Sequence, residues 1–219
     1  MNILAIDTTT KKATVALKTN NNHIYFKEVD NEITHSEKLL PLLDEVLNSA
    51  NINLKNIDLF ATTLGPGSFT GVRIGIATIK AIAKVTNRKV FGTTSLELLA
   101  MDGIKKSTFT PKYVLSLMDA RNTRVYYNLY KYDDGKLISL EFAGNDYAKD
   151  VISNIEKMDL KDLLVVINNN TINLENAVVA SLDLKNIFEL DMSSNLYDYL
   201  NLDAMYYRKS EAERTKDGE

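Results

Sequence analysis

The chain has 219 residues, of which 45% are hydrophobic and 25% are charged, as is typical of a globular protein with a sizeable core. It contains no cysteine, which excludes a disulfide framework, a thiol nucleophile and any cysteine-ligated zinc or iron–sulfur site. The formal net charge of -3 argues against a protein coated in basic patches for nucleic acid. The first residues lack the features of a secretory signal, and no apolar run approaches the ~18 residues of a membrane span, so a cytoplasmic protein is expected.

The first half of the chain predicts three strands followed by alternating helices and strands. Apolar or alternating patterns favour strands at 3–6, 13–17, 23–29, 57–64 and 90–92. Leucine and valine at helical spacing predict a first helix, with Thr34 and Glu37 as its capping box and Pro41 bending its first turns. A second helix follows GPGSFTG at residues 65–71 and runs to about Thr86, and a third, shorter helix closes this half.

The second half repeats the opening pattern, because a strand ending in Asp119 matches the first strand ending in Asp7. Further strands are predicted at 124–132, 136–142, 163–167 and 187–190, with a helix at 148–158. The repeat indicates an internal duplication. We therefore expect an α/β protein of two lobes, residues 1–104 and 105–210, with 211–219 disordered.

Asp7 and Asp119 have two interpretations. An aspartate at the end of a first strand, followed by small hydroxyl residues and a hairpin, can hold a phosphate or a metal-bound water. Alternatively, each carboxylate caps its own turn through the backbone, and residue types alone favour this structural role. The two aspartates are therefore candidates for vestigial phosphate turns.

The sequence GPGSFTG also has two interpretations. A glycine-rich turn before a helix N-terminus can bind an anion. Neither nucleotide fingerprint fits, because Thr70 replaces the last glycine of GxGxxG, and Val72-Arg73 stands where Walker A needs Lys followed by Ser or Thr. A tight turn that lets the helix lie close to the sheet is therefore favoured.

The sequence has only two histidines and no cysteine to bind a metal ion. The two histidines are His23 and His35, and Leu39 stands four residues after His35, so a two-histidine pair on one helix face is absent. No GxSxG elbow supports a serine nucleophile. We predict no metal site.

The helix at 70–85 is apolar on about three sides, and its charged stripe is limited to Arg73, Lys80 and Lys84. One sheet covers only one side, so the rest must pack on another helix, in this chain or in a partner; both options stay open. The candidate partner interface on the first two helices comprises Leu39, Leu43, Gly71, Ile74, Gly75, Ala77, Thr78, Ala81 and Ile82.

Three segments together resemble the TsaB family: ILAIDTTT at the start, GPGSFTGVRIG in the middle and YYRKSEAE near the end. The resemblance covers the first half and the C-terminal end. It implies the actin-like ATPase fold of sugar kinases, Hsp70 and actin, built from two βββαβαβα units with a reduced second lobe. TsaB is the bacterial non-catalytic partner in making threonylcarbamoyladenosine on tRNA.

The resemblance therefore implies a pseudoenzyme that acts as scaffold or activator, with no catalytic residue and no cofactor. The related catalytic subunit TsaD carries a metal-binding HxxxH that this sequence lacks. TsaD transfers a threonylcarbamoyl group to the adenosine next to the anticodon of tRNAs that read ANN codons. The implied partners are a TsaD-like subunit, bound as a heterodimer through the first-lobe helices, and a TsaE-like ATPase. A homodimer is an alternative for the chain alone, and tRNA is expected only through the complex.

A different function remains open at this point, namely a self-sufficient small kinase or ATPase of the same fold. It requires a nucleotide cleft with phosphate turns in both lobes. Only the turns at Asp7 and Asp119 hint at one, and no adenosine loop is recognisable. ATP binding and hydrolysis by the isolated chain separate the two functions.

Overall fold

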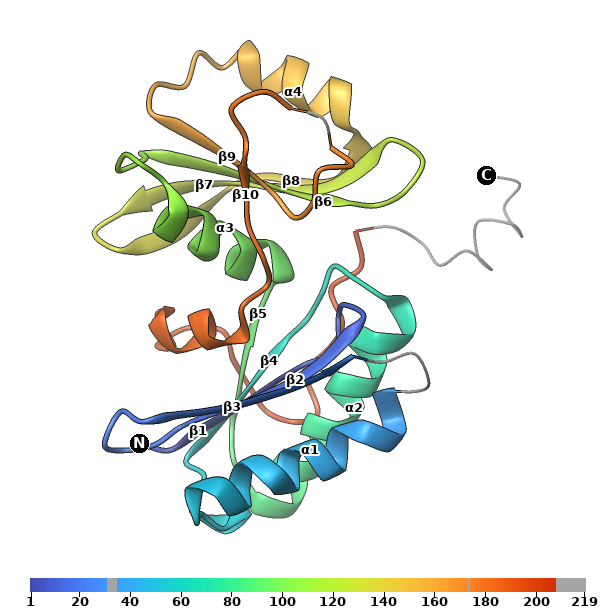
Figure 1. Ribbon diagram of the computed structural model, residues 1–219, viewed down its shortest axis with the longest axis vertical. Helices are drawn as coiled ribbons and strands as arrows, with labels where there is room; N and C mark the ends of the chain where they lie inside the picture. Colours follow the sequence, from blue (N-terminus) through green and yellow to red (C-terminus); the bar gives the residue numbers. More distant parts are fainter. Residues whose placement is uncertain (31–34, 173, 208–219) are drawn as a thin grey trace. The chain divides into compact units, whose positions relative to one another are not determined.

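The computed structural model describes residues 1–30, 35–172 and 174–207, and the chain divides into two compact units. The first unit comprises Met1–Ser95 and Leu184–Met205. The second comprises Leu96–Asp183 and, among the described residues, Tyr206 and Tyr207. Each unit has one sheet with helices on it (Figure 1).

The first unit is built on a six-stranded sheet in the order β11-β5-β4-β1-β2-β3 (Figure 1). The strands are β1 (Ile3–Asp7), β2 (Lys12–Lys18), β3 (Ile24–Asp30), β4 (Leu59–Thr63), β5 (Val90–Thr93) and β11 (Leu196–Tyr197). The first three form an antiparallel meander, β4 runs parallel to β1, and β5 runs parallel to β4. All residues of β1 and β4 are buried, as expected for central strands covered on both faces.

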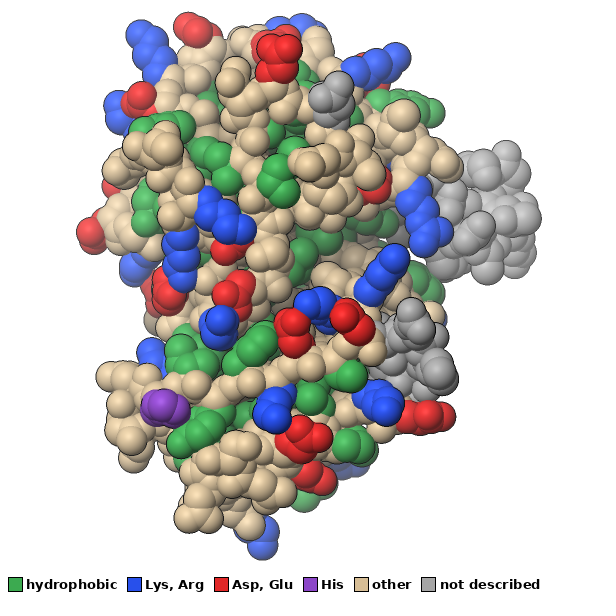
Figure 2. Space-filling model, viewed as in Figure 1, with side chains coloured by type: hydrophobic (Ala, Val, Ile, Leu, Met, Phe, Trp, Pro, Cys, Tyr) green, Lys and Arg blue, Asp and Glu red, His purple; other side chains and the backbone are tan. Residues whose placement is uncertain are grey.

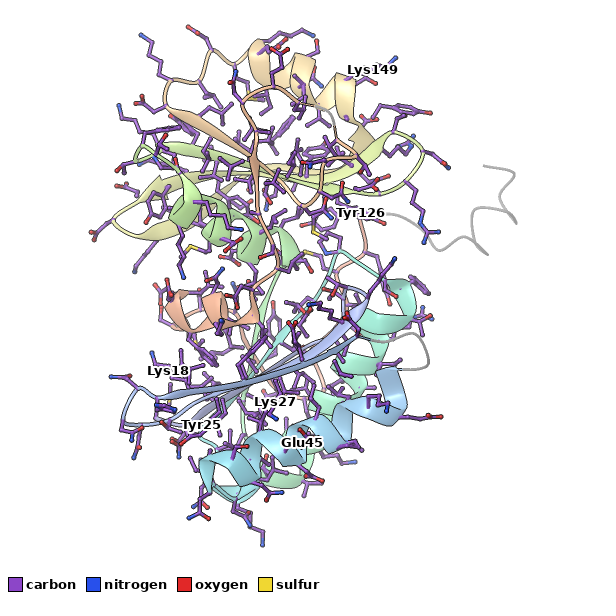
Figure 3. All side chains as sticks on the ribbon, in the orientation of Figure 1. Lys18, Tyr25, Lys27, Glu45, Tyr126 and Lys149 are labelled. Atoms are coloured by element: carbon purple, nitrogen blue, oxygen red, sulfur yellow. The ribbon has the colours of Figure 1, made fainter. Side chains whose placement is uncertain are left out.

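Two helices cover one face of this sheet. α1 (His35–Ala50) packs on β2 and β3, whereas α2 (Phe69–Thr86) packs on β4, β1 and β5 and contacts α1. Lys27 of β3 reaches Glu45 of α1 at 3.4 Å on the solvent side (Figure 3). Pro41 lies inside α1 as predicted, but the capping box at Thr34 lies outside the described residues.

Two short 3-10 helices complete the first unit. η1 (Leu54–Asn56) precedes β4, and η2 (Leu184–Glu189) packs on β1 and β2 (Figure 1). The strand predicted at 187–190 is therefore wrong, because residues 187–189 form the end of η2 and bury Ile187 and Phe188 against the sheet.

The segment 184–205 was predicted in the second lobe, and the structure corrects this. β11 pairs antiparallel with β5 at the edge of the first sheet, and Leu202 is fully buried in the core of the first unit. The Met205 N–H donates to the Leu64 carbonyl at 2.8 Å, and Lys80 Nζ donates to the Leu202 carbonyl at 2.9 Å. Strand pairing and core burial thus fix this segment on the first unit.

The second unit is built on a five-stranded sheet in the order β10-β9-β6-β7-β8, which repeats the order β5-β4-β1-β2-β3 within the first sheet. Its strands are β6 (Tyr113–Asp119), β7 (Arg124–Asp133), β8 (Lys136–Tyr147), β9 (Leu163–Ile167) and β10 (Val178–Val179). β6, β7 and β8 form the antiparallel meander, β9 runs parallel to β6, and β10 runs parallel to β9. The predicted duplication is therefore confirmed in strand order and direction.

The helices show that the second unit is the reduced one. α4 (Ala148–Glu156) follows β8 as α1 follows β3, but it has 9 residues against 16. Among the described residues between β9 and β10 there is no helix in the place of α2, and Ile172 from this loop is buried in the core instead. α3 (Ser95–Lys106) is predicted to close the first lobe, and the structure corrects this: from Leu96 onward it belongs to the second unit, where Leu96 and Leu99 are buried in a core with residues of β6, β7 and β9. None of the described helices is long and apolar enough to cross a membrane.

Candidate functional site: the Asp7 turn and helix α2

Asp7 ends β1, and its side chain is buried at 3% exposure. Its Oδ1 accepts hydrogen bonds from the Thr9 N–H at 3.2 Å and from Thr9 Oγ1 at 2.7 Å. The hydroxyl of Thr63, the last residue of β4, donates to the same oxygen. Ser95 Oγ in turn donates to Thr9 Oγ1 at 3.2 Å. The bond from the Thr9 N–H is the backbone cap of the structural interpretation, and the bond from Thr63 in addition joins the carboxyl ends of β1 and β4.

Asp119 occupies the same place in the second unit, but it is half-buried. Its Oδ1 accepts from the Arg121 N–H at 2.8 Å, and its Oδ2 accepts from Thr171 Oγ1 at 3.2 Å. The Asp119 N–H donates to Asn168 Oδ1 at 3.0 Å. Thr171 and Asn168 belong to the loop that stands in the place of α2, so this loop fixes the second turn.

The glycines around the start of α2 pack directly on the turn after β1. An ideal Cβ on Gly67 would lie 2.3 Å from the Thr9 carbonyl oxygen, and one on Gly71 would lie 2.0 Å from that of Thr8. On Gly75 it would lie 2.5 Å from Thr8 Oγ1. Such distances leave no room for a side chain, so glycine is what allows the helix to lie this close to the sheet.

The N-terminus of α2 is held by bonds within the chain. Ser68 is the N-cap, and its Oγ accepts from the Gly71 N–H at 3.2 Å. The Ser68 N–H donates to the Thr9 carbonyl at 2.7 Å. The N–H groups of Ser68 and Gly71, which could bind an anion at a helix N-terminus, therefore donate to oxygens of the chain itself.

The outward side of α2 carries small and apolar side chains. Ala77 and Ala81 are exposed, Ile74, Thr78 and Ile82 are half-buried, and these are the members of the candidate interface that reach the surface. Val85 on the same helix is 85% exposed, and Leu40 on α1 is 53% exposed. The candidate interface leaves out both of these exposed apolar residues, although each follows the helical spacing of its neighbours.

The structure corrects the candidate interface at four positions. Leu39 and Leu43 are 1% and 3% exposed, and they belong to the core under α1. Gly71 and Gly75 are buried against Thr8. A helix that is apolar on three sides does not reveal from sequence which side meets its own sheet, so inner and outer residues were assigned together.

The cationic side of α2 serves the chain's own packing. The Arg73 guanidinium lies 3.9 Å from the centre of the Phe69 ring, and Lys84 Nζ lies 6.0 Å from that of the Tyr199 ring. Lys80 binds the Leu202 carbonyl.

On the face drawn in Figure 2, basic and acidic side chains are interspersed rather than gathered by sign. This pattern is not that of a nucleic-acid surface.

Two groups of the second unit, Asp102 and Tyr207, have shifted pKa values. Burial raises the pKa of Asp102, but the Lys106 ammonium at 2.7 Å and two hydrogen bonds from Ser181 outweigh burial and bring it below its usual range. Burial raises the pKa of Tyr207, with a smaller contribution from Glu97. Within the described ranges, no three His, Asp or Glu side chains lie close enough to hold a metal ion.

Comparison with known proteins identifies the family. Residues 30–179 match the family model described as TsaD, tRNA N6-adenosine threonylcarbamoyltransferase. The chain is 35% identical over 135 residues to the tRNA threonylcarbamoyladenosine biosynthesis protein TsaB of Escherichia coli K12, which is 61% of this chain and 57% of that protein. It is 32% identical over 142 residues to the protein of the same name from Bacillus subtilis 168, covering 63% and 58%. The chain thus matches less than two thirds of the length of these relatives.

Solved structures agree on the fold. Two structures from Pseudomonas aeruginosa, one titled as similar to the peptidase YeaZ and one titled YeaZ, give TM-scores of 0.74 and 0.75. Each match covers 94% of this chain and 99% of the other, at 21% and 20% identity. Together with the duplicated sheets, this likeness confirms the α/β actin-like fold. Because the family model matches more than half of the chain, the chain belongs to the TsaD family, and the two curated relatives described above carry the TsaB name.

Proposed function

We propose that this chain is a non-catalytic partner of a TsaD-type subunit in the formation of threonylcarbamoyladenosine on tRNA. Family membership supports the pathway. The observation that carries the partner role is the outward side of α2, where Ala77 and Ala81 are exposed beside half-buried Ile74, Thr78 and Ile82. Small residues four apart let a second helix approach closely, so this side suits a helical partner surface.

The state of the first turn supports a role without catalysis. The Asp7 carboxylate is buried and accepts from Thr9 and Thr63, and the loop before α2 donates to Thr9. These groups hold β1, β4 and α2 together. We infer that the turn has kept the shape of a phosphate turn as a structural element.

The proposed assembly follows from this surface. The TsaD-type subunit binds α2 as a heterodimer in the cytoplasm, a TsaE-type ATPase joins the pair, and tRNA is bound only by the complex. In the absence of the catalytic subunit, a second copy of the chain can use the same side of α2.

A reconstituted transfer assay tests this function. Threonylcarbamoyl transfer from its adenylate to a tRNA that reads an ANN codon is measured with the TsaD-type subunit of the same genome, with the chain, and with both. The TsaE-type ATPase and ATP are present throughout. We expect product only when both proteins are present. Transfer by the chain alone, or no gain over the catalytic subunit alone, would contradict the proposal.

The same preparations test the alternative of a small kinase or ATPase. ATP hydrolysis is measured with the chain alone, without the TsaE-type protein. We expect no turnover above the buffer. Steady hydrolysis that is lost in Asp7→Ala, in a variant that remains folded, would favour the alternative instead.

A further inference from the structure

We propose that Thr8 is a positioning residue for the partner-binding side of α2. Thr8 lies in the turn after β1 and is 1% exposed, so it acts through the helix rather than by touching a partner. The inference rests on the proposed function, because it concerns the surface through which the TsaD-type subunit would bind.

Thr8 holds two successive turns of α2. Its Oγ1 donates to the Gly71 carbonyl at 2.7 Å, and its own carbonyl oxygen would lie 2.0 Å from a Cβ on Gly71. One turn further along the helix, Oγ1 would lie 2.5 Å from a Cβ on Gly75. A single residue thus fixes both the height of the helix above the sheet, through contact, and its rotation, through a directional hydrogen bond.

The apolar contacts of α2 cannot fix its position as sharply. Val72, Ile76, Ile79 and Ala83 form its buried apolar side. Apolar contacts tolerate small displacements, whereas a backbone in direct contact with a threonine has little freedom to move. Thr8 and the two glycines are therefore the points of direct contact that set where the first turns of α2 lie, next to the Ser68–Thr9 hydrogen bond at its N-terminus.

A displacement at Gly75 reaches the outward side directly. At 100° per residue, Ala77 lies about 200° around the helix from Gly75, so the two point to nearly opposite sides. As long as Thr8 Oγ1 keeps its hydrogen bond to the Gly71 carbonyl, a methyl group on residue 75 moves from 2.5 Å to the 3.4 Å of an ordinary contact, which shifts the helix outward by about 0.9 Å. A shift of this size disturbs the complementarity that a closely packed interface requires.

The test is a double-mutant cycle on Thr8 and Gly75. Gly75→Ala, Thr8→Ala and Thr8→Ala/Gly75→Ala are compared with the natural chain for Kd to the TsaD-type subunit, well below each melting temperature. We expect Gly75→Ala to weaken binding about tenfold and Thr8→Ala by about threefold or less. The double variant should return to within about threefold of Thr8→Ala, because removing Oγ1 makes room for the new methyl.

A partner-independent readout separates positioning from stability. Amide chemical shifts of Ala77 and Ala81 should move in Gly75→Ala and return toward those of Thr8→Ala in the double variant. Gly144→Ala on β8 is the matched control, since its Cβ would meet the hydroxyl end of Tyr127 at 3.0 Å, and its binding should be unchanged.

The outcomes distinguish this inference from the function on which it rests. Failure of the natural chain to bind the TsaD-type subunit overturns the proposed function. Normal binding together with a Gly75→Ala variant that binds equally well overturns the role of Thr8, as does a double variant no tighter than Gly75→Ala. If Gly75→Ala does not fold, the double variant decides: binding within about threefold of Thr8→Ala supports the role, and weaker binding or failure to fold overturns it.

Discussion

Asp7 and Asp119 end the first strand of two sheets with the same strand order, yet their surroundings differ. Asp7 is buried and accepts from Thr63 at the end of β4. Asp119 is half-buried and is held by Asn168 and Thr171, which follow β9. The carboxyl ends of neighbouring parallel strands lie at one sheet edge. Each aspartate therefore contacts the residues at or just after the end of its neighbouring strand. The duplicated sheet sets the place of the aspartate, and the end of the neighbouring strand or the segment after it sets its environment.

The segments after β4 and β9 explain the difference. After β4, residues 69–86 are mostly apolar or good helix formers, and they give the 18 residues of α2. After β9, residues 168–176 include five asparagines, which are poor helix formers. The first unit therefore keeps α1 and α2 as a pair of helices on one face of its sheet, whereas the second has α4 and a loop in the corresponding places.

Among the substitutions that test this difference, we expect the largest loss of stability at Gly71. Gly71→Ala would place a methyl 2.0 Å from the Thr8 carbonyl oxygen, where only movement of the backbone relieves the clash. We expect a loss of about 3 kcal/mol in the free energy of unfolding, measured in urea. The control is Gly135→Asn in the β7–β8 turn, where a Cβ meets nothing within 4 Å and asparagine tolerates the positive φ of 76°. Equal midpoints for the two variants would show that α2 does not depend on this close approach.

The two aspartates should differ in their contribution to stability. Asp7→Ala leaves the Thr9 N–H and the Thr9 and Thr63 hydroxyls without their buried acceptor, so we expect a loss of about 3 kcal/mol. Asp119→Ala affects a half-exposed turn and should cost about 1 kcal/mol. Urea unfolding of both variants measures the difference. An Asp119→Ala loss as large as that of Asp7→Ala would remove the contrast between the turns.

The unfolding free energy should fall in acid in part because Asp102 of the second unit becomes protonated. Its pKa is lowered in the folded state by Lys106 and Ser181, so its stabilisation is complete above the unfolded value of about 4. The stabilisation is lost as pH falls through that value toward the folded one. We therefore expect the unfolding free energy of Asp102→Asn to fall less between pH 6 and pH 3 than that of the natural chain. An equal or larger fall in the variant would contradict this account of the carboxylate.

The smallest expected effect concerns Thr62, which lies on β4 under α2. Its Oγ1 is buried without a hydrogen-bond partner and would lie 3.9 Å from a Cβ on Gly75. Thr62→Val replaces this hydroxyl by a methyl of similar size, so stability should stay equal or rise by up to about 1 kcal/mol. Thr63→Val, which removes a donor to Asp7, is the neighbouring control and should destabilise. A loss of stability in Thr62→Val would mean that its hydroxyl has a partner after all.

The sequence predicted those parts of the fold that have a local periodic signal. The meanders, the limits of α2 and the duplication follow from alternation and helical spacing over many residues. β11 has two residues and pairs with a strand about a hundred positions earlier, so it leaves no local pattern, and its segment was placed in the wrong unit. The pattern at 187–190 is apolar but short, and such runs do not distinguish a strand from a buried 3-10 turn.

The candidate site was predictable in location but not in orientation. The Asp7 turn and GPGSFTG can both be recognised in the sequence, and the structure brings them into contact. Gly71 and Gly75 belong to the inner side of α2 because they contact Thr8, and helical spacing on a helix that is apolar on three sides does not reveal this contact. Leu39 and Leu43 were misplaced because apolar spacing marks a buried side without saying what buries it.

The affinity of Ala77→Glu for the TsaD-type subunit tests the central claim most directly. Ala77 is exposed on α2, so the variant should fold with nearly unchanged melting. A glutamate buried there without a partner should weaken binding by several kcal/mol, about 100-fold or more. Ala143→Glu, the same change on exposed Ala143 of β8, should bind as the natural chain does. A folded Ala77→Glu variant that binds normally would contradict α2 as the partner surface, and one that unfolds would contradict its outward position.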